Sequence, residues 1–385
     1  MPVIAVAALS ARPLAQAARD DGYRVIGLDL FGDADTRAAC IQWLPIGDAS
    51  TLCIDTAALL DALAILARRG DVVGWVVGSG FEGRPDLLER GAALLPLIGN
   101  RADAVRRVRD PAAFFGFLDR LGIDHPAVSL RAPETAGGWL LKDAHGCGGS
   151  HIRRATAACR AESDHHYFQR EAGGAPMSAT FIAAYGDADA DAAEAAFVLG
   201  FNQLVVRGVG DRPFVYCGVV GPVALPGDAA RQAGAAVREI AAEFGLRGLA
   251  SLDFLLDGDA ISVLEVNPRP PASMALYGPN LFEAHRRACV GGDWRAGLAP
   301  PADAVAHAVV RGVETVFAPR SLRLDAATAR AIAALPDCHD WPAAARFEAG
   351  DPLCSVAAAG SGAEAVHALL AQRRQAVHRL LENLS

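Results

Sequence analysis

Hydrophobic positions in the first hundred residues alternate between short continuous apolar runs and helical patterns. The apolar runs, which are typical of buried strands, are Val3–Ala8, Tyr23–Leu30 and Val72–Val77. The helical patterns between them cover residues 11–21 and 56–69. Strands that alternate with helices predict βαβ units around an open parallel sheet. This pattern ends at Pro96 to Asn100, so we expect an N-terminal α/β domain over residues 1–100.

From residue 101 the pattern favours strands, with two clear helices among them. The first helix covers residues 111–121, with Pro111 at its start and Gly122 as its stop signal. The second covers residues 229–244, is amphipathic and ends at Gly245. The predicted strands are Trp139–Leu141, a strand and hinge from Tyr167, Ala179–Tyr185, and a hairpin over residues 249–266. We therefore expect a second, α+β unit over residues 101–295.

The composition changes after about residue 300, and Pro300-Pro301 predicts a boundary there. Beyond it the predicted elements are a strand or strand pair over 305–318, a strand over 353–359 and a closing helix over 362–384. We find no catalytic set of side chains in this part of the sequence. We expect a small α+β module over residues 296–385 that acts as a scaffold or an oligomerisation element, which leaves a homo-oligomer open.

The composition is that of a globular protein, because 52% of the 385 residues are hydrophobic and 21% are charged. A net charge of −8 argues against a nucleic-acid or anionic-membrane surface. We find no apolar run of 18 residues and no basic segment before the first apolar run, so we expect neither a membrane span nor a signal peptide. The eight cysteines form no CxxC pair, which is typical of reduced thiols. We therefore expect a cytoplasmic protein.

Lys142 is the one lysine among 36 basic side chains, and it follows the apolar run Trp139–Leu141. A loop with Gly146, Gly148 and Gly149 comes next. An ammonium is a compact point charge, and glycines let backbone N–H groups approach a ligand closely. A strand, a lysine and a glycine loop therefore indicate a phosphate site, although the Walker A pattern is absent. The alternative is a glycine-rich hairpin with an incidental lysine.

The hairpin over residues 249–266 carries three oxygen donors within apolar strands. Its turn is Asp257-Gly258-Asp259, and a loop of about three residues would set Asp253 opposite Glu265. Asn267 shares a face with Glu265 because the two are two residues apart. Buried carboxylates need a partner, and Mg²⁺, or Mn²⁺ in its place, is the cation that oxygen donors and phosphates favour. Arg269 can reach a transferred phosphoryl group. The alternative is a polar hairpin with its acids in solvent.

Two further segments are candidate ligand contacts. A loop follows the strand Val72–Val77, and ligands gather at the carboxyl ends of strands in open α/β sheets. We expect this loop, if it is more than a tight βα turn, to contact the substrate through Gly78, Ser79, Gly80, Phe81 and Glu82. The hinge after Tyr167 could present an amide and backbone groups to an adenine edge, through Gln169, Arg170, Glu171 and Ala172.

Two weaker patterns point elsewhere. Asp187, Asp189 and Asp191 imitate the start of a calcium loop, but Ala192 and Val198 break that pattern, so we expect a solvated hairpin tip. Asp29 imitates the ribose-binding acid of a dehydrogenase, but the preceding turn has no glycine. An NAD-dependent oxidoreductase therefore remains only a minor alternative.

The order of these pieces resembles the ATP-grasp superfamily of carboxylate–amine ligases, over about residues 100–290. The resemblance implies an N-terminal open parallel α/β domain, a two-lobed core with a small lobe over about 125–185 and a large lobe over about 186–295, and a C-terminal module. It also implies that Lys142 and the Gly146–Gly149 loop contact the phosphates of ATP and that residues 169–172 hold adenine. Asp253, Glu265 and Asn267 would hold one or two Mg²⁺, and Arg269 would face an acyl phosphate.

This sequence departs from the family pattern at two places. The family has an earlier lysine where this chain has Asp110-Pro111, and a nearby arginine (Arg106, Arg107 or Arg109) could substitute for it. The family's ribose-binding acid falls on Pro176. An ATP-binding module with weak or no catalysis is therefore an alternative.

The resemblance implies that ATP converts a small-molecule acid to an acyl phosphate, which an amine then attacks to give an amide. The substrate-side segments, which include Gly78–Glu82, Asn202-Gln203 and Tyr216-Cys217-Gly218, look most like tyramine–glutamate ligase-like enzymes. Those enzymes build one-carbon cofactors of the methanofuran and tetrahydromethanopterin type. We therefore expect an amino-acid-like substrate in one-carbon cofactor biosynthesis.

Overall fold

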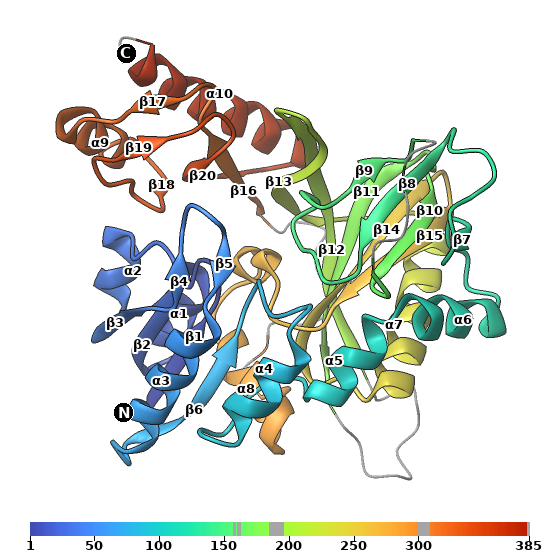
Figure 1. Ribbon diagram of the computed structural model, residues 1–385, viewed down its shortest axis with the longest axis horizontal. Helices are drawn as coiled ribbons and strands as arrows, with labels where there is room; N and C mark the ends of the chain where they lie inside the picture. Colours follow the sequence, from blue (N-terminus) through green and yellow to red (C-terminus); the bar gives the residue numbers. More distant parts are fainter. Residues whose placement is uncertain (157–158, 160–162, 185–195, 297, 299–308, 383–385) are drawn as a thin grey trace.

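The structure is a computed structural model, and it describes residues 1–156, 159, 163–184, 196–296, 298 and 309–382. Figure 1 shows an N-terminal part in blue at lower left, a central part in green and yellow on the right, and a C-terminal part in red at upper left. The predicted hairpin tip with Asp187, Asp189 and Asp191 lies outside the described residues, as does the predicted boundary at Pro300-Pro301.

A parallel sheet organises the N-terminal part, as predicted. Its strand order within the described residues is β3-β2-β1-β6. The strands are β1 Val3–Ala7, β2 Arg24–Asp29, β3 Gln42–Pro45 and β6 Val72–Val77, with a ribbon of β4 Gly47–Asp48 and β5 Cys53–Ile54. All five residues of β1 are buried, because hydrophobic clusters cover both faces of the sheet. The helices are α1 Arg12–Asp20, α2 Ala34–Ala39, α3 Thr56–Ala67 and α4 Pro85–Ala92.

The central part has a small antiparallel sheet facing a larger one. The order of the small sheet, over the residues described, is β7-β10-β8-β9. Its strands are β7 Val128–Ser129, β8 Trp139–Asp143, β9 Arg153–Arg154 and β10 His166–Arg170. The larger sheet begins with β15-β14-β11-β12-β13. Those strands are β11 Ala175–Ala183, β12 Ala196–Val209, β13 Arg212–Val223, β14 Gly248–Asp257 and β15 Ala260–Asn267.

Helices α6 Pro111–Leu121 and α7 Gly227–Phe244 supply apolar side chains to the core of the central part. Both were predicted, and both end at a glycine with positive φ, Gly122 and Gly245. The remaining helices of the central part are α5 Ala102–Val108, the 3₁₀ helix η2 Ala272–Leu276 and α8 Leu281–Val290.

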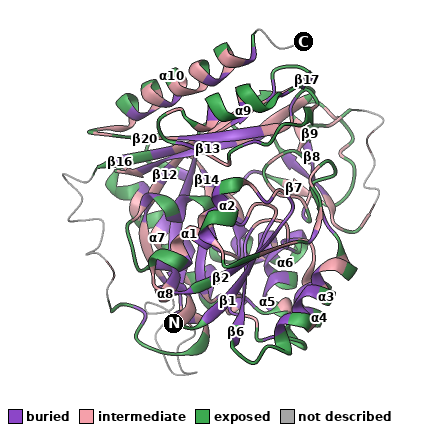
Figure 2. Ribbon diagram, turned by 90° about the vertical axis from the view of Figure 1, so that its left-hand side faces the viewer, coloured by how far each residue is buried: buried purple, intermediate pink, exposed green. Residues whose placement is uncertain are grey.

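The C-terminal part extends the larger sheet and also contains a separate two-stranded sheet, β17 Leu322–Arg323 with β19 Arg346–Phe347. Strand β16 Val310–Phe317 pairs with β13, and β20 Pro352–Gly360 and β18 Cys338–His339 follow. Helix α10 Ala363–Leu381 packs Val366 and Leu370 on this extension, and Figure 2 shows its opposite face exposed. Helix α9 Ala326–Ala333 also lies in this part. The domain limits at residues 100 and 295 remain predictions, since one described sheet spans the second of them.

Strands β12 and β13 are long, and the hydrophobic pattern did not predict their full extent. They form a hairpin in which Val209 pairs with Arg212 across Gly210-Asp211. A two-residue turn that contains glycine is a recognised hairpin signal, so the signal was present in the sequence. These strands matter because they form one wall of the cavity described below.

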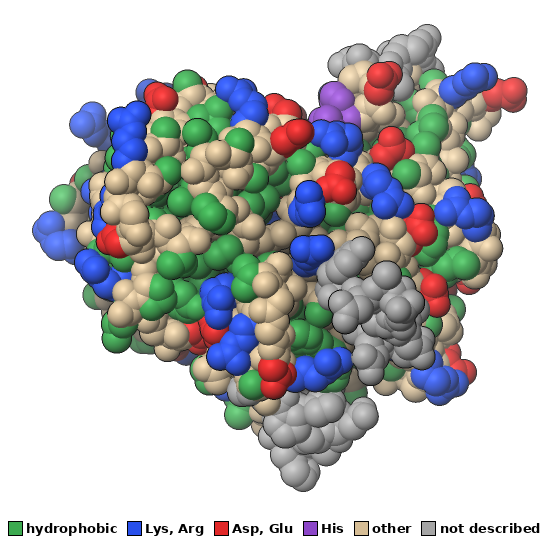
Figure 3. Space-filling model, turned by 90° about the horizontal axis from the view of Figure 1, so that it is seen from below, with side chains coloured by type: hydrophobic (Ala, Val, Ile, Leu, Met, Phe, Trp, Pro, Cys, Tyr) green, Lys and Arg blue, Asp and Glu red, His purple; other side chains and the backbone are tan. Residues whose placement is uncertain are grey.

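On the face seen in Figure 3, arginine and acidic side chains are interspersed among hydrophobic ones. The described residues of that face therefore create no broad field of one sign. None of the described helices has the length and apolar character needed to cross a membrane.

Candidate active site

A cavity of about 540 Å³ lies between the small sheet and the larger sheet of the central part. Strands β8 and β10 line one side, and β11 to β15 line the other. It brings together most of the residues that the sequence singled out, namely Lys142, Gly148, Gly149, Gln169, Arg170, Glu171, Ala172, Asp253, Glu265, Asn267 and Arg269. Among the described residues of the prediction, Gly146 and Gly78–Glu82 do not line it.

Lys142 lies on β8 with 4% of its surface exposed, and its Nζ donates a hydrogen bond to Gln169 Oε1 at 2.8 Å. Burial lowers the pKa of Lys142, and the negative charges of Glu265 and Asp253 oppose that effect. The ammonium and the acids of the hairpin therefore share one electrostatic environment. The buried ammonium is well placed to bind phosphate oxygens. The two carboxylates are well placed to bind a metal ion that those phosphates also coordinate.

Gln169 contacts Lys142 through its oxygen and leaves its amide nitrogen available. Its Nε2 is buried and has no partner among the described residues. His151, which also lines the cavity, has a buried Nδ1 that likewise has no hydrogen-bond partner among the described residues. A buried polar atom without a partner costs about 1–3 kcal/mol. The two atoms therefore indicate that a polar ligand belongs in the cavity, as the prediction of an adenine edge at Gln169 requires.

The glycine loop packs tightly against β13. Gly149 has φ +74°, and a Cβ at this position would lie 1.9 Å from the carbonyl oxygen of Phe214. The N–H of Tyr216 donates to Gly148 O at 2.9 Å. Glycine is therefore required at 149 by both conformation and space. Gly146, the first glycine of the loop, does not line the cavity, and its carbonyl accepts a hydrogen bond from Arg109.

Asp253, Glu265 and Asn267 meet as predicted, although the hairpin differs in detail. The turn has two residues, since Asp257 pairs with Ala260, and a register shift after Asp253 restores the pairing of Asp253 with Glu265. Burial and the nearby charge of Glu265 raise the pKa of Asp253 to about 7. Burial also acts on Glu265, but Arg109, Lys142 and His151 together lower its pKa. Asn267 donates from its Nδ2 to Asp253 Oδ2 at 3.1 Å, and its Oδ1 accepts from Arg269. Two half-buried carboxylates and this amide together supply the oxygen donors that Mg²⁺ prefers.

Of the three arginines that the sequence offered as substitutes for the family's earlier lysine, Arg109 is the one that reaches this site. It is buried, and it donates to Ala144 O and Gly146 O, both at 2.9 Å, and to Glu265 Oε2 at 3.2 Å. Arg107, two residues earlier and still on α5, instead pairs with Glu243 on the surface. The sequence could not decide among Arg106, Arg107 and Arg109, because helix periodicity alone does not show which side chain reaches the site between the two sheets.

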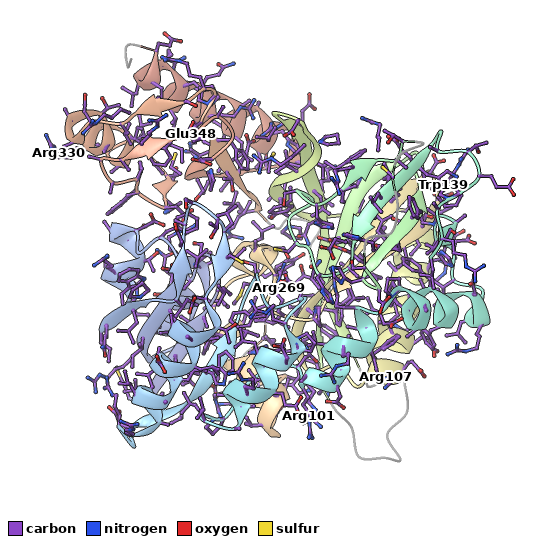
Figure 4. All side chains as sticks on the ribbon, viewed as in Figure 1. Arg101, Arg107, Trp139, Arg269, Arg330 and Glu348 are labelled. Atoms are coloured by element: carbon purple, nitrogen blue, oxygen red, sulfur yellow. The ribbon has the colours of Figure 1, made fainter. Side chains whose placement is uncertain are left out.

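The loop after β6 reaches the site through a single side chain. Glu82 is 3% exposed, and its Oε1 accepts a hydrogen bond from Arg269 Nε at 2.8 Å. Figure 4 shows Arg269 at the centre of the molecule, where the N-terminal and central parts meet. Phe81 packs in the N-terminal core against Trp75. The proposed substrate contact of this loop remains a prediction, and Glu82 is the residue that would carry it.

Asp29 has a structural role that the sequence did not predict. It is fully buried and accepts hydrogen bonds from Ala11 N, Gly32 N and Trp43 Nε1. Its carboxylate therefore ties the C-terminal end of β2 to the start of α1 and to β3, and it has no access to a ribose. This corrects the suggestion of a dehydrogenase-type nucleotide site.

Comparisons with known proteins bear on the fold that holds these residues. Residues 109–273 match the family model of the ATP-grasp domain. The structure is similar to the L-amino acid ligase from Bacillus licheniformis, with a TM-score of 0.70, 13% identity and 97% of each chain covered. It is also similar to the biotin carboxylase from Campylobacter jejuni, with a TM-score of 0.70, 14% identity, and 100% of this chain and 91% of that chain covered.

The chain has the ATP-grasp fold. At these identities the structural likeness speaks for the fold alone. A curated relative, the carbamoyl phosphate synthase large chain of Halomonas eurihalina, is 25% identical over 304 residues. That match covers 72% of this chain and only 27% of the relative. The predicted fold class, an open parallel α/β domain followed by a two-lobed ATP-grasp core and a C-terminal module, is confirmed.

Proposed function

We propose that this protein is an ATP-dependent carboxylate–amine ligase that forms an amide through an acyl phosphate, with Mg²⁺ or Mn²⁺ as its cation. One observation carries the proposal: a single cavity joins Lys142, the glycine loop and the orphaned amide of Gln169 to the oxygen donors of the β14–β15 hairpin. The ATP-grasp fold and the structural likeness to an L-amino acid ligase support it.

Each of these residues has a proposed role that follows from its charge and position. Gln169 Nε2 would donate to the adenine, and Lys142 would neutralise phosphate oxygens beneath the backbone N–H groups of Gly148 and Gly149. Asp253, Glu265 and Asn267 would hold the cation, which neutralises charge on the phosphates when bound. Arg269, fixed by Glu82, would face the acyl group. Positioning and charge stabilisation supply most of the rate, so no nucleophilic side chain is needed.

The proposed acid substrate is amino-acid-like. Support comes from the likeness in fold to an L-amino acid ligase, with 97% of both chains covered. The more specific role in one-carbon cofactor biosynthesis stays a prediction. Of the segments that suggested it, Tyr216 lines the cavity, whereas Asn202 is buried in a hydrogen-bond network with Ser178, Thr180 and Tyr277. Tyr216 is therefore the first residue to vary in a test of that role.

The test is ADP release with a panel of amino acids and amines, with products read by mass. The wild-type chain should form ADP and an amide product together for at least one pair. Lys142→Ala and Glu265→Ala should lose both. Glu348→Ala is the matched control, since Glu348 is exposed in the C-terminal part (Figure 4) and pairs with Ser321 and Arg346. Unchanged turnover in both site variants would refute these assignments.

One observation favours a second candidate, an ATP-binding module with weak catalysis. Arg109 stands where the family has a lysine, but its guanidinium is engaged by Ala144 O, Gly146 O, Glu265 and Val266 O. This arginine therefore has little capacity left for a phosphate. ATP·Mg binding without ADP release across the whole panel would support this candidate over the ligase.

A further inference from the structure

A second cluster of metal-ligand side chains lies at one end of the small sheet. Asp143 is the last residue of β8, and His165 and His166 stand at the start of β10. Each offers one ligand atom, and these atoms all lie within 4.8 Å of one another. None of the three lines the cavity between the sheets. The cluster is therefore separate from the proposed ATP site.

Strand pairing produces the cluster. Strands β8 and β10 are antiparallel, and Asp143 is the register partner of His166. Successive side chains on a strand point to opposite faces, so Asp143 faces away from the cavity that Lys142 faces. Strand pairing therefore holds the carboxylate beside His166. His165 lies just before β10, where its Nε2 is 3.7 Å from Asp143 Oδ1.

The spacing suits coordination by a common ion. Asp143 Oδ1 lies 3.7 Å from His165 Nε2, and Asp143 Oδ2 lies 3.9 Å from His166 Nε2. Both separations exceed the usual hydrogen-bond range of about 2.7–3.2 Å. A tetrahedral ion with bonds of about 2.0–2.1 Å places its ligand atoms about 3.3 Å apart. Small side-chain adjustments would bring the three atoms to that distance.

Neighbouring groups orient the carboxylate and leave it accessible. The N–H of His145 donates to Asp143 Oδ1 at 2.8 Å, and the His145 ring stacks on His165 with centroids 4.2 Å apart. The side chains of His165, Asp143 and His166 are 34%, 28% and 14% exposed. A cavity of about 440 Å³ also borders His166, and the buried Ser163 Oγ on its wall has no partner among the described residues. An ion from solvent can therefore reach the cluster.

We propose that Asp143, His165 and His166 form a binding site for a divalent transition-metal ion, with Zn²⁺ as the best match. Two imidazoles and one carboxylate are typical zinc ligands, whereas Mg²⁺ and Ca²⁺ prefer oxygen donors. Three protein ligands leave a fourth position for water. A bound ion would tie the end of β8, just before the glycine loop, to the start of β10.

The experiment uses the full chain without a histidine tag, stripped with a chelator. Zn²⁺ is titrated by calorimetry in excess Mg²⁺, which keeps the hairpin donors occupied, and Co²⁺ is used as a spectroscopic probe of ligand geometry. We expect one Zn²⁺ per chain, a raised melting temperature, and a Co²⁺ spectrum of low coordination number. Asp143→Ala and His165→Ala should each weaken binding by at least about tenfold and abolish the shift in melting temperature, since each removes one ligand of three.

Two controls separate this site from others on the chain. His367→Ala removes a histidine that pairs with Gln203 in the C-terminal part, and it should leave Zn²⁺ binding unchanged. Asp253→Asn disables the proposed Mg²⁺ site and should also leave it unchanged. Zn²⁺ binding that survives both cluster variants would overturn the proposal, as would binding lost in Asp253→Asn or on alkylation of the cysteines. The thermal shift with ATP·Mg reports whether each cluster variant is folded.

Discussion

The guanidinium of Arg109 lies 3.2 Å from the carboxylate of Glu265, and it also holds the carbonyl oxygens of Ala144 and Gly146. One side chain therefore connects the hairpin that carries the proposed metal ligands to the glycine loop that would cover the phosphates. The arginine side chain is 5% exposed and the glutamate side chain 25% exposed, so the pair is largely removed from water. Removal of the Arg109 side chain would leave the Glu265 carboxylate, which is partly buried and next to Asp253, without its nearest cation.

Arg109→Ala should therefore destabilise the chain and lower turnover. Breaking a buried ion pair by removing one partner costs about 3–5 kcal/mol, and the exposure of Glu265 places this case toward the lower end. Arg109→Lys should recover only part of the loss, since an ammonium cannot contact three acceptors in a fork. Urea melts measure the first effect and ADP release the second. Arg107→Ala is the control, because its partner Glu243 is on the surface, and it should change stability by no more than about 0.5 kcal/mol.

Gly149→Ala should weaken ATP binding. A methyl group at this position meets the carbonyl oxygen of Phe214, and the backbone has φ +74°. The loop must then move away from β13, so its N–H groups would no longer face the phosphates. The measurement is the thermal shift with ATP·Mg. Gly173→Ala is the matched control, since a Cβ added at Gly173 would meet no other group within 4 Å. Equal shifts in the two variants would contradict a close-packed glycine loop.

Glu82→Gln should lower turnover while leaving ATP binding intact. Glu82 holds Arg269 Nε at 2.8 Å, and its carboxylate also accepts from Gly80 N, so the change removes the charge that orients the arginine. Losing a charge-assisted hydrogen bond costs about 1.5–3 kcal/mol, which corresponds to about tenfold or more in rate. Steady-state ADP release with a saturating acid substrate measures the effect. Glu89→Ala removes an exposed partner of Arg106 and should have no effect.

His285 should make the stability of the chain depend on pH. Its Nδ1 accepts a hydrogen bond from Leu249 N at 2.9 Å, and its Nε2 faces Ile98 O at 3.1 Å, so the neutral ring satisfies both neighbours. Burial lowers the pKa of His285 to about 4. The unfolded chain has a histidine pKa of about 6.5, so it binds a proton first as the pH falls. This contribution to stability is complete above pH of about 6.5 and is lost on acidification toward pH 4.

The expected slope is about 1.4 kcal/mol of unfolding free energy per pH unit within that window. Urea melts at pH 7.5 and pH 5 should therefore differ more in the wild-type chain than in His285→Gln. His367→Ala is the control, since it removes a histidine that pairs with Gln203 far from His285 in the sequence. Identical pH dependence in all three proteins would contradict this account.

Local sequence patterns were sufficient for several parts of the site. The β14–β15 hairpin brings Asp253 opposite Glu265 because strands joined by a short turn have few possible registers. The prediction was right about the pair but assumed a three-residue loop. The chain instead uses a two-residue turn and a register shift beside Asp253, which the hydrophobic pattern does not reveal. Lys142 and its glycine loop were likewise visible, since a strand end and three glycines are neighbours in sequence.

The sequence by itself determined the open sheet of the first hundred residues, the helices that end at Gly122 and Gly245, and the residue types of the proposed ATP site, because each depends on contacts between near neighbours. Only the tertiary structure decided that Arg109 rather than Arg106 or Arg107 reaches Glu265, and that Glu82 holds Arg269 from another part of the chain. It also decided that Asp29 is a buried structural acid. These contacts join residues that are distant in sequence or depend on packing around them, and no local periodicity encodes the partner of a side chain that reaches across two sheets.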